Sequence, residues 1–339
     1  MRKELLNLLL CPTCSSTKFD FAVEDENSVE VRRGKATCIN CKSEYTVKNG
    51  VIDFLLNPRI DVISEQKGWL YLAKQNGSYK QEIIEQLAAK LPDINSLCNP
   101  VFREHWLPHV TNFNSALKIL NLKGSEKILD IGAGRCWTTK TFAKFGCQAI
   151  AFDILSDNVL GLGAADNMIS EKLYFERTIG DMEKLPFRSE SFDVVFSTAS
   201  IHHSDIHKSI SEASRILKSG GRLVLINEPT VSANDERLTK LECEEVKVGI
   251  AEHIYSIADY CSATENAGIE PNLYYPSGAL FMIKLILRKP LGQPYLRKTK
   301  LLASALFKAR IANSKTLPLI WHLNKLKPYF GLFLIGLKT

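Results

Sequence analysis

The clearest structural signal in this 339-residue chain is the stretch Ile128-Leu-Asp-Ile-Gly-Ala-Gly-Arg-Cys136. A short apolar strand, Lys127–Ile131, ends where Gly132 and Gly134 allow a tight turn and a close approach of the backbone to a ligand. A helix then continues through Thr139 to Phe145. Strand, glycine turn and helix in this order predict a cofactor site at the start of the helix.

Further short apolar strands follow this loop and alternate with helices. We expect strands at Gln148–Asp153, Ser191–Ser197 and Arg222–Asn227, with a helix at Ile206–Leu217 before the last of them. Strands of this kind, separated by helices, form a parallel sheet that is buried on both faces. The pattern therefore predicts an α/β fold.

The residues around the loop exclude a dinucleotide and favour another cofactor. A dinucleotide fingerprint needs a glycine where Trp137 stands. Asp130 would repel a pyrophosphate but would suit an ammonium group. Asp153 ends the next strand and can accept hydrogen bonds from both hydroxyls of a ribose, while Asp181 with the amide of Met182 can bind an adenine edge. An amino acid, a ribose and an adenine together describe S-adenosylmethionine.

This part of the chain resembles the class I S-adenosylmethionine-dependent methyltransferases, especially the ubiquinone/menaquinone methyltransferase group. Five motifs in the family's order carry the resemblance: Ile128–Gly134, Ala151–Ile154, Gly180–Phe187, Phe192–His203 and Leu217–Leu225. The resemblance implies a Rossmann-like sheet of seven strands. Its last strand should be antiparallel and should lie at Phe330–Leu337.

The same resemblance implies the cofactor contacts. Gly132 and Gly134 would line the methionine portion, Asp153 would hold the ribose, Asp181 and Met182 would hold the adenine, and Ile154 would lie against the adenine face. One position departs from the family: Cys136 stands where a third glycine is usual. Because a cysteine is small, we expect the loop to accommodate it and the cofactor still to bind.

A second signal lies near the amino terminus, where four cysteines form two C-x-x-C pairs. The ligand candidates are Cys11, Cys14, Cys38 and Cys41, with 23 residues between the pairs. Paired thiolates at this spacing are typical of a zinc ribbon, and four sulfur ligands with no open position indicate a structural Zn²⁺. The other five cysteines are scattered and predict no second cluster.

The chain divides into three predicted parts. Residues 1–57 form the zinc ribbon, in which Glu44–Phe54 contains an Asn-Gly turn between two strands. Residues 58–120 form a helical linker or cap, with a helix at Gln81–Leu91 that ends before a proline. Residues 121–339 form the methyltransferase domain, with a basic helical insertion at about 277–328.

The charge distribution is strongly uneven. Residues 271–339 contain twelve Lys and Arg and no acidic residue, whereas residues 1–270 hold all 37 acidic residues and the other 31 of the 43 basic ones. A basic segment with apolar clusters could bind an anionic membrane surface, and its positive charge could also bind the phosphates of RNA. It could equally be a solvated surface or a lid over the site. No stretch is apolar enough to span a membrane, so we expect a cytoplasmic protein that is either free or bound peripherally to a membrane.

Side chains at the ends of two later strands are candidates for a catalytic base. His202, His203 and Asp205 follow one strand, and Glu228 follows another. Ligands of open α/β sheets bind at the carboxyl ends of strands. His203 is the first candidate and Glu228 the second, although such residues could also simply shape the loop.

Three functions are compatible with these features. The first is methyl transfer to a small-molecule acceptor or to one linked to a lipid or saccharide. The second is methylation of an RNA base, with the basic segment holding the phosphates. The third is a cofactor-binding scaffold without catalysis, against which the acidic residues of the pocket argue. Neither the acceptor atom nor the oligomeric state follows from the sequence.

Overall fold

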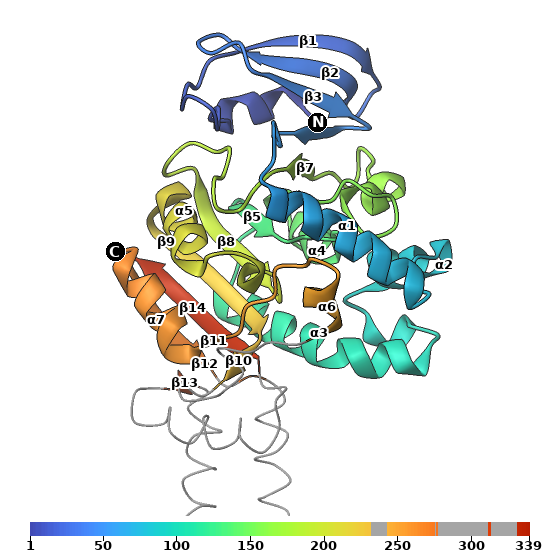
Figure 1. The fold of residues 1–339 in the computed structure, drawn as a ribbon, viewed down its shortest axis with the longest axis vertical. Helices are drawn as coiled ribbons and strands as arrows, with labels where there is room; N and C mark the ends of the chain where they lie inside the picture. Colours follow the sequence, from blue (N-terminus) through green and yellow to red (C-terminus); the bar gives the residue numbers. More distant parts are fainter. Residues whose placement is uncertain (232–242, 275, 277–310, 313–330) are drawn as a thin grey trace, which may run out of the picture.

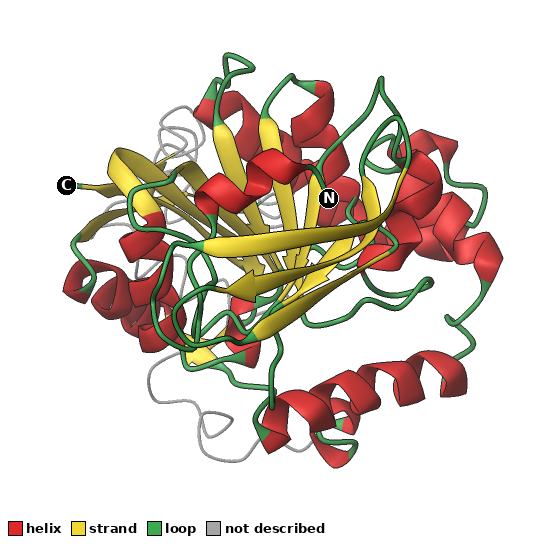
Figure 2. Ribbon diagram, turned by 90° about the horizontal axis from the view of Figure 1, so that it is seen from above, coloured by secondary structure: helices red, strands yellow, loops and turns green. Residues whose placement is uncertain are grey.

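The computed structural model describes residues 1–231, 243–274, 276, 311–312 and 331–339. A small amino-terminal sheet stands at one end of a larger α/β body, and the helix α1 leads from the first to the second (Figure 1). Figure 2 shows helices on both faces of the central sheet.

The amino-terminal unit is a four-stranded meander that follows a 3₁₀ turn at Lys3–Leu8. Its strands are β1 (Phe19–Glu26), β2 (Val31–Cys38), β3 (Glu44–Lys48) and β4 (Val51–Asp53). Asn49 and Gly50 both have positive φ, which suits the tight turn between β3 and β4. The hairpin that the Asn-Gly pair predicts is therefore present.

The central sheet has the strand order β7-β6-β5-β8-β9-β14-β12. Its strands are β5 (Lys127–Ile131), β6 (Gln148–Asp153), β7 (Glu176–Ile179), β8 (Phe192–Thr198), β9 (Leu217–Glu228), β12 (Ile269–Tyr274) and β14 (Leu332–Lys338). Strand β14 runs antiparallel to both of its neighbours. The predicted Rossmann-like sheet of seven strands with an antiparallel last strand is confirmed, and β14 begins two residues later than expected.

Two central strands, β12 and β7, are absent from the strands expected from the sequence, and β7 shows a physical reason. It is short and contains charged residues, among them the fully buried Arg177. The Arg177 guanidinium can be buried because it pairs with the carboxylate of Glu30, 2.8 Å away. A hydrophobicity pattern cannot reveal a strand whose polar residue is matched by a partner more than a hundred residues away.

The amino-terminal sheet and the central sheet are continuous. Strand β4 pairs in parallel with β7, with Val51 opposite Arg177 and Asp53 opposite Ile179, and the amide of Phe54 donates to the carbonyl of Ile179. The result is a single twelve-stranded sheet, which also includes the short β13 (Ile311–Ala312) beside β12. Because β4 and β7 are parallel, the linker after β4 begins at the end of the sheet where β7 also ends.

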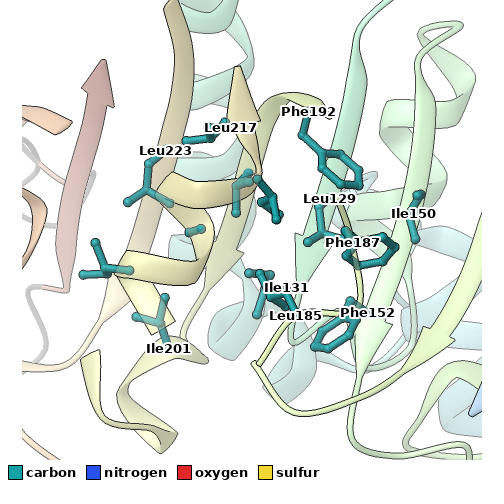
Figure 3. Packing of buried hydrophobic residues seen from close by; sticks show 14 of the residues in the cluster. Leu129, Ile131, Ile150, Phe152, Leu185, Phe187, Phe192, Ile201, Leu217 and Leu223 are labelled. Carbon is teal, nitrogen blue, oxygen red and sulfur yellow. The ribbon is translucent and has the colours of Figure 1, made fainter. Parts of the chain in front are cut away.

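The core lies on both faces of the central sheet. Neighbouring residues of one strand belong to different hydrophobic clusters, as Ile128 and Leu129 of β5 show. The cluster that contains Leu129 also includes Ile131, Phe152 and Phe187 (Figure 3). Burial on both faces is the arrangement expected of parallel strands.

Helices cover these two faces. The longer ones are α1 (Ile60–Gln75), α3 (Pro100–Leu120), α4 (Trp137–Lys144), α5 (Ile206–Ile216) and α7 (Ile257–Asn266). Short elements are α2 (Gln81–Ile83), α6 (Glu244–Lys247), 3₁₀ turns at Ile94–Ser96, Leu162–Met168 and Ile201–His203, and the paired β10 (Thr230–Val231) and β11 (Tyr255–Ser256).

Residues 60–120 are mainly helical, and the expected helix at Gln81–Leu91 takes an unexpected form. After α2 the chain continues as a π-helix at Ile84–Lys90. The buried Lys140 of α4 donates to the carbonyls of Ala88 and Ala89, 2.6 Å from each. These bonds satisfy carbonyl groups at the end of the π-helix and hold it against α4.

The predicted basic insertion at about 277–328 lies outside the described residues, apart from β13. In the described part of the chain, no helix combines the length and the hydropathy that a bilayer crossing requires.

Candidate functional site

A cavity of about 650 Å³ opens beside the carboxyl ends of the central strands. The glycine loop after β5, the end of β6, the turn after β7 and the turn after β8 form one side. Residues of α1 and α3 form the other side. This volume is typical of a small-molecule site.

The glycine loop is anchored to the neighbouring strand. The amides of Gly132 and Ala133 both donate to the carbonyl of Phe152. Gly132 has a φ of +68°, and a Cβ on it would lie 1.6 Å from Oγ of Ser200. Only glycine fits this position, because the backbone is left-handed and the Ser200 side chain fills the adjoining space.

Cys136, which replaces the family's usual third glycine, has a left-handed backbone with a φ of 61°. Its side chain is fully buried and fits, as expected from its size. The left-handed backbone, however, is unfavourable for any residue other than glycine, whatever the size of its side chain, and costs about 1 kcal/mol. The replacement of glycine by Cys136 therefore strains the backbone but causes no steric clash.

Asp153 lines the cavity at the end of β6. Its Oδ2 accepts from the amide of Gly134 at 2.8 Å, and its Oδ1 accepts from the amide of Leu155 at 2.9 Å. Each oxygen keeps a lone pair that can accept a further bond. Burial raises the pKa of Asp153, although these amides favour the ionised form.

Asp181 also lines the cavity, but it has a partner that the sequence analysis did not identify. Its Oδ1 accepts from the amide of Glu183, and its Oδ2 lies 3.2 Å from Nη1 of Arg59. The same guanidinium pairs with Glu183 at 2.6 Å and with Asp61 at 3.1 Å. Arg59 thereby connects the start of α1 to the predicted adenine site.

The other predicted cofactor residues divide into two groups. Gly132, Gly134, Ile154 and Met182 all line the cavity together with Asp153 and Asp181. Asp130 is not among the lining residues. It is fully buried, its Oδ2 accepts from the hydroxyls of Thr138 and Thr139, and burial raises its pKa to about 7.

Asp130 therefore holds the first turn of α4 against the loop, and its Oδ1 has no hydrogen-bond partner. This arrangement does not match the direct ammonium contact that its position on the strand predicts.

The two candidate bases occupy different environments. His203 lines the cavity, whereas Glu228 is fully buried outside its lining. Oε1 of Glu228 accepts from the amide of Ser200 at 3.0 Å, and Oε2 lies 2.6 Å from Nδ1 of His202. Glu228 thus shapes the loop after β8, and its burial does not suit the role of a base.

His202 carries a charge next to His203. Burial opposes that charge, but hydrogen bonds to Glu228 and Glu252 raise the pKa of His202 to about 9. Burial and the His202 charge together lower the pKa of His203 to about 4. At neutral pH, His202 is therefore an imidazolium and His203 a neutral imidazole.

The tautomer of His203 follows from its hydrogen bond. Its Nδ1 lies 2.9 Å from the carbonyl of Ala251 and must donate to it, so that Nε2 carries the free lone pair. His202, His203 and Glu252 lie close enough together to hold a metal ion. Both ring nitrogens of His202 already face carboxylates, with Nδ1 2.6 Å from Glu228 and Nε2 3.5 Å from Glu252, and we interpret the cluster as a hydrogen-bonded network.

Helix α1 supplies cavity residues that the sequence analysis did not identify. Val62, Glu65, Trp69 and Leu72 recur at helical spacing and all line the cavity. Glu65 is only 8% exposed, and burial raises its pKa to about 8. The sequence feature that could have identified Glu65 as a site residue is its acidic side chain on an otherwise apolar face of a helix.

The four predicted zinc ligands lie together at one end of the amino-terminal unit. Their sulfur atoms all lie within 4.8 Å of one another, with 3.6 Å between Cys11 and Cys41 and 3.6 Å between Cys14 and Cys38. Tetrahedral Zn²⁺ with bonds of about 2.3 Å places its sulfur ligands about 3.8 Å apart. The cluster therefore fits a structural Zn²⁺.

Comparisons with known proteins identify residues 129–225 as matching the family described as "Methyltransferase domain". The chain is similar to the uncharacterized methyltransferase YcgJ of Bacillus subtilis, with 31% identity over 113 residues, covering 33% of this chain and 44% of the relative. It is also similar to the demethylmenaquinone methyltransferase of Tropheryma whipplei, with 33% identity over 112 residues, covering 33% of this chain and 45% of the relative. The matches thus span under half the length of these relatives.

Among solved structures, the chain is similar to a complex of the Haloferax volcanii Trm112 methyltransferase activator with a methyltransferase. The TM-score is 0.47 and the identity 17%, with 75% of this chain and 97% of that chain covered.

Proposed function

Because residues 129–225 match the family described as "Methyltransferase domain", we propose that this protein transfers a methyl group from S-adenosylmethionine to a small-molecule acceptor. The observation that carries the proposal is the shared cavity. Gly132, Asp153 and Asp181 come from three separate motifs, and all line one space of about 650 Å³. In this proposal, Asp153 binds the ribose hydroxyls, Asp181 and Met182 bind the adenine, and Ile154 packs on its face.

The cofactor supplies an activated methyl group, so the residues of the chain mainly align the two reactants. Asp153 is prepared for the ribose, since backbone amides hold both of its oxygens in place. His203 is the group available to receive a proton from the acceptor. Its neutral state and its fixed tautomer leave Nε2 as the acceptor atom.

The affinity for the cofactor tests this site. We expect Asp153→Asn to weaken binding of S-adenosylmethionine and S-adenosylhomocysteine by about 10- to 100-fold, because hydrogen bonds to a charged group contribute about 1.5–3 kcal/mol. Isothermal titration calorimetry measures this change.

Asp20→Asn, at an exposed position of β1, is the matched control and should leave both affinities unchanged. Tight binding of NADH by the wild type, with no heat from either sulfur compound, would refute the proposed function.

The class of acceptor is tested by label transfer. Radiolabelled S-adenosylmethionine is incubated with the protein and with separate lipid, RNA, protein and small-molecule fractions of an extract. Small-molecule or lipid-linked products support the proposal, while label in RNA would favour the RNA alternative, which the relatives named above do not support. Binding of the cofactor without any transfer would favour the scaffold.

We further propose that Cys11, Cys14, Cys38 and Cys41 hold one structural Zn²⁺. A bound ion would tie together the two C-x-x-C turns, one of which precedes β1 while the other lies between β2 and β3. Such an ion contributes directly to folding.

Metal analysis tests this proposal. We expect the purified protein to contain about one zinc per chain and Cys38→Ser to lose most of it, because three thiolates hold the ion less tightly than four. Cys98→Ser removes an exposed cysteine outside the cluster and should leave the zinc content unchanged. Equal zinc content in the two variants would contradict the assignment.

A further inference from the structure

We propose that Glu65 selects the acceptor, and that the acceptor is an amine with an apolar body, methylated on nitrogen. This inference rests on the proposed methyl transfer and extends it to the substrate. It follows from the charges and side chains that line the cavity, taken one group at a time.

Most charged groups of the cavity are already paired or assigned. Five carboxyl groups line it, from Asp61, Glu65, Asp153, Asp181 and Glu245. Arg59 pairs with Asp61 and Asp181, and Asp153 accepts two backbone amides. Glu245 belongs to the short α6 and is only half-buried.

Glu65 differs from these groups because it is buried and has no strong partner. Its Oε1 accepts a long bond of 3.4 Å from Nε1 of Trp69 and lies 3.7 Å from Nδ1 of His203. That nitrogen already donates to the carbonyl of Ala251. Among the described residues, no lysine or arginine lies within ion-pair distance of Glu65. Its carboxyl group therefore remains available for a ligand.

The wall around Glu65 suits a cation with an apolar body. Trp69, Phe102 and Trp106 line the same cavity, and the ring of Trp69 lies edge-on to His203 with centroids 5.4 Å apart. Aromatic faces attract ammonium groups, most strongly where water is excluded. Within the described part of the chain, the lysines and arginines that line the cavity are Arg59, which is paired, and Arg135, which donates to the carbonyl of Val159. An anionic acceptor would face an excess of acidic groups.

The direction of charge movement also favours nitrogen. The amine binds as an ammonium beside Glu65 and gives up one proton to water through Nε2 of His203, because an imidazole with a pKa of about 4 does not keep it. Its lone pair then forms the N–C bond while the C–S bond breaks, and sulfur keeps that electron pair as a thioether. The positive charge thus moves from sulfur to nitrogen, toward the carboxylate. A hydroxyl acceptor would have to become more negative beside the same carboxylate, which the site would oppose.

The high pKa of Glu65 is consistent with this role. Burial raises it to about 8, so that the empty cavity holds a neutral carboxyl group, and an approaching ammonium favours its ionisation. A site that becomes charged only when its ligand is present avoids the cost of an isolated buried carboxylate.

The test uses three probes that share one ring: benzylamine, benzyl alcohol and benzoate. Each is titrated at neutral pH into the full chain saturated with S-adenosylhomocysteine, with tryptophan fluorescence and calorimetry as readouts. We expect benzylamine to bind at least about tenfold more tightly than benzyl alcohol, and benzoate to bind most weakly. In Glu65→Gln the advantage of benzylamine should fall below about twofold.

Glu245→Gln is the matched control, since it removes one carboxylate from the lining of the same cavity and should keep the preference. The affinity of each variant for S-adenosylhomocysteine shows whether the variant is folded. The proposal is overturned if benzyl alcohol or benzoate equals benzylamine in the wild type, or if none of the three binds. It is also overturned if Glu65→Gln weakens the cofactor analogue instead of the amine. Failure of the wild type to bind the analogue at all would instead refute the proposed function.

Discussion

Replacing Arg177 by methionine is expected to destabilise the protein by about 3–5 kcal/mol, the usual cost of removing one partner of a buried ion pair. The Arg177 side chain is fully buried in β7, and its Nη2 lies 2.8 Å from Glu30 and 2.9 Å from the carbonyl of Asn49. Its Nη1 lies 3.2 Å from Asp166. Without the guanidinium, the buried Glu30 keeps two cationic partners among the described residues, Arg32 at 2.7 Å and the amino-terminal ammonium of Met1 at 3.0 Å.

Chemical and thermal unfolding followed by circular dichroism measure this effect. Because Arg177 joins the amino-terminal sheet to the central one, we expect both parts to lose stability together. Arg33→Met, at an exposed position whose nearest carboxylate is 3.6 Å away, should change the free energy of unfolding by less than about 1 kcal/mol. A loss below about 1 kcal/mol for Arg177→Met would show that this pair does not hold the two sheets together.

The second large effect is expected on turnover. His203→Ala should lower kcat by about 10²- to 10⁴-fold, the usual contribution of a positioned base, while the affinity for the cofactor remains within a few-fold of wild type. The readout is a label-transfer assay with the acceptor found by extract fractionation, combined with calorimetry for the cofactor. His207→Ala, at an exposed position of α5, is the control.

The pH profile gives an independent check on His203. Because burial and the neighbouring His202 lower its pKa to about 4, the imidazole is uncharged from about pH 5 upward. Wild-type turnover should therefore show no loss between pH 7 and pH 6 from protonation of this residue. Full turnover by His203→Ala would assign it a purely structural role in the loop.

The local features of this protein could be predicted from its sequence. Strands β5 and β6 match the expected ranges residue for residue, because each is a short apolar run bounded by turn residues. The two C-x-x-C pairs predict a cysteine cluster since each pair needs only a tight turn, and a ribbon brings the two turns together. Asp153 could be chosen because it ends a predicted strand, and Asp181 because the motif Gly180–Phe187 resembles the family's adenine-binding segment.

Other features depend on residues that are distant in the sequence, and only the tertiary structure could decide them. Asp130 and Glu228 carry the residue types expected of a site, but both are buried: Asp130 accepts from hydroxyls of α4, and Glu228 accepts from the backbone of the loop after β8. Arg59 and Glu65 belong to no motif, and they reach the cavity because the fold packs α1 and the residue before it beside the ends of the strands. The junction of β4 with β7 likewise requires Glu30 and Arg177 to meet. The period of hydrophobic residues and the spacing of motifs depend on a few neighbouring residues. The burial of a side chain depends on the packing of the whole chain, and burial in turn decides the charge of that side chain and the groups it bonds to.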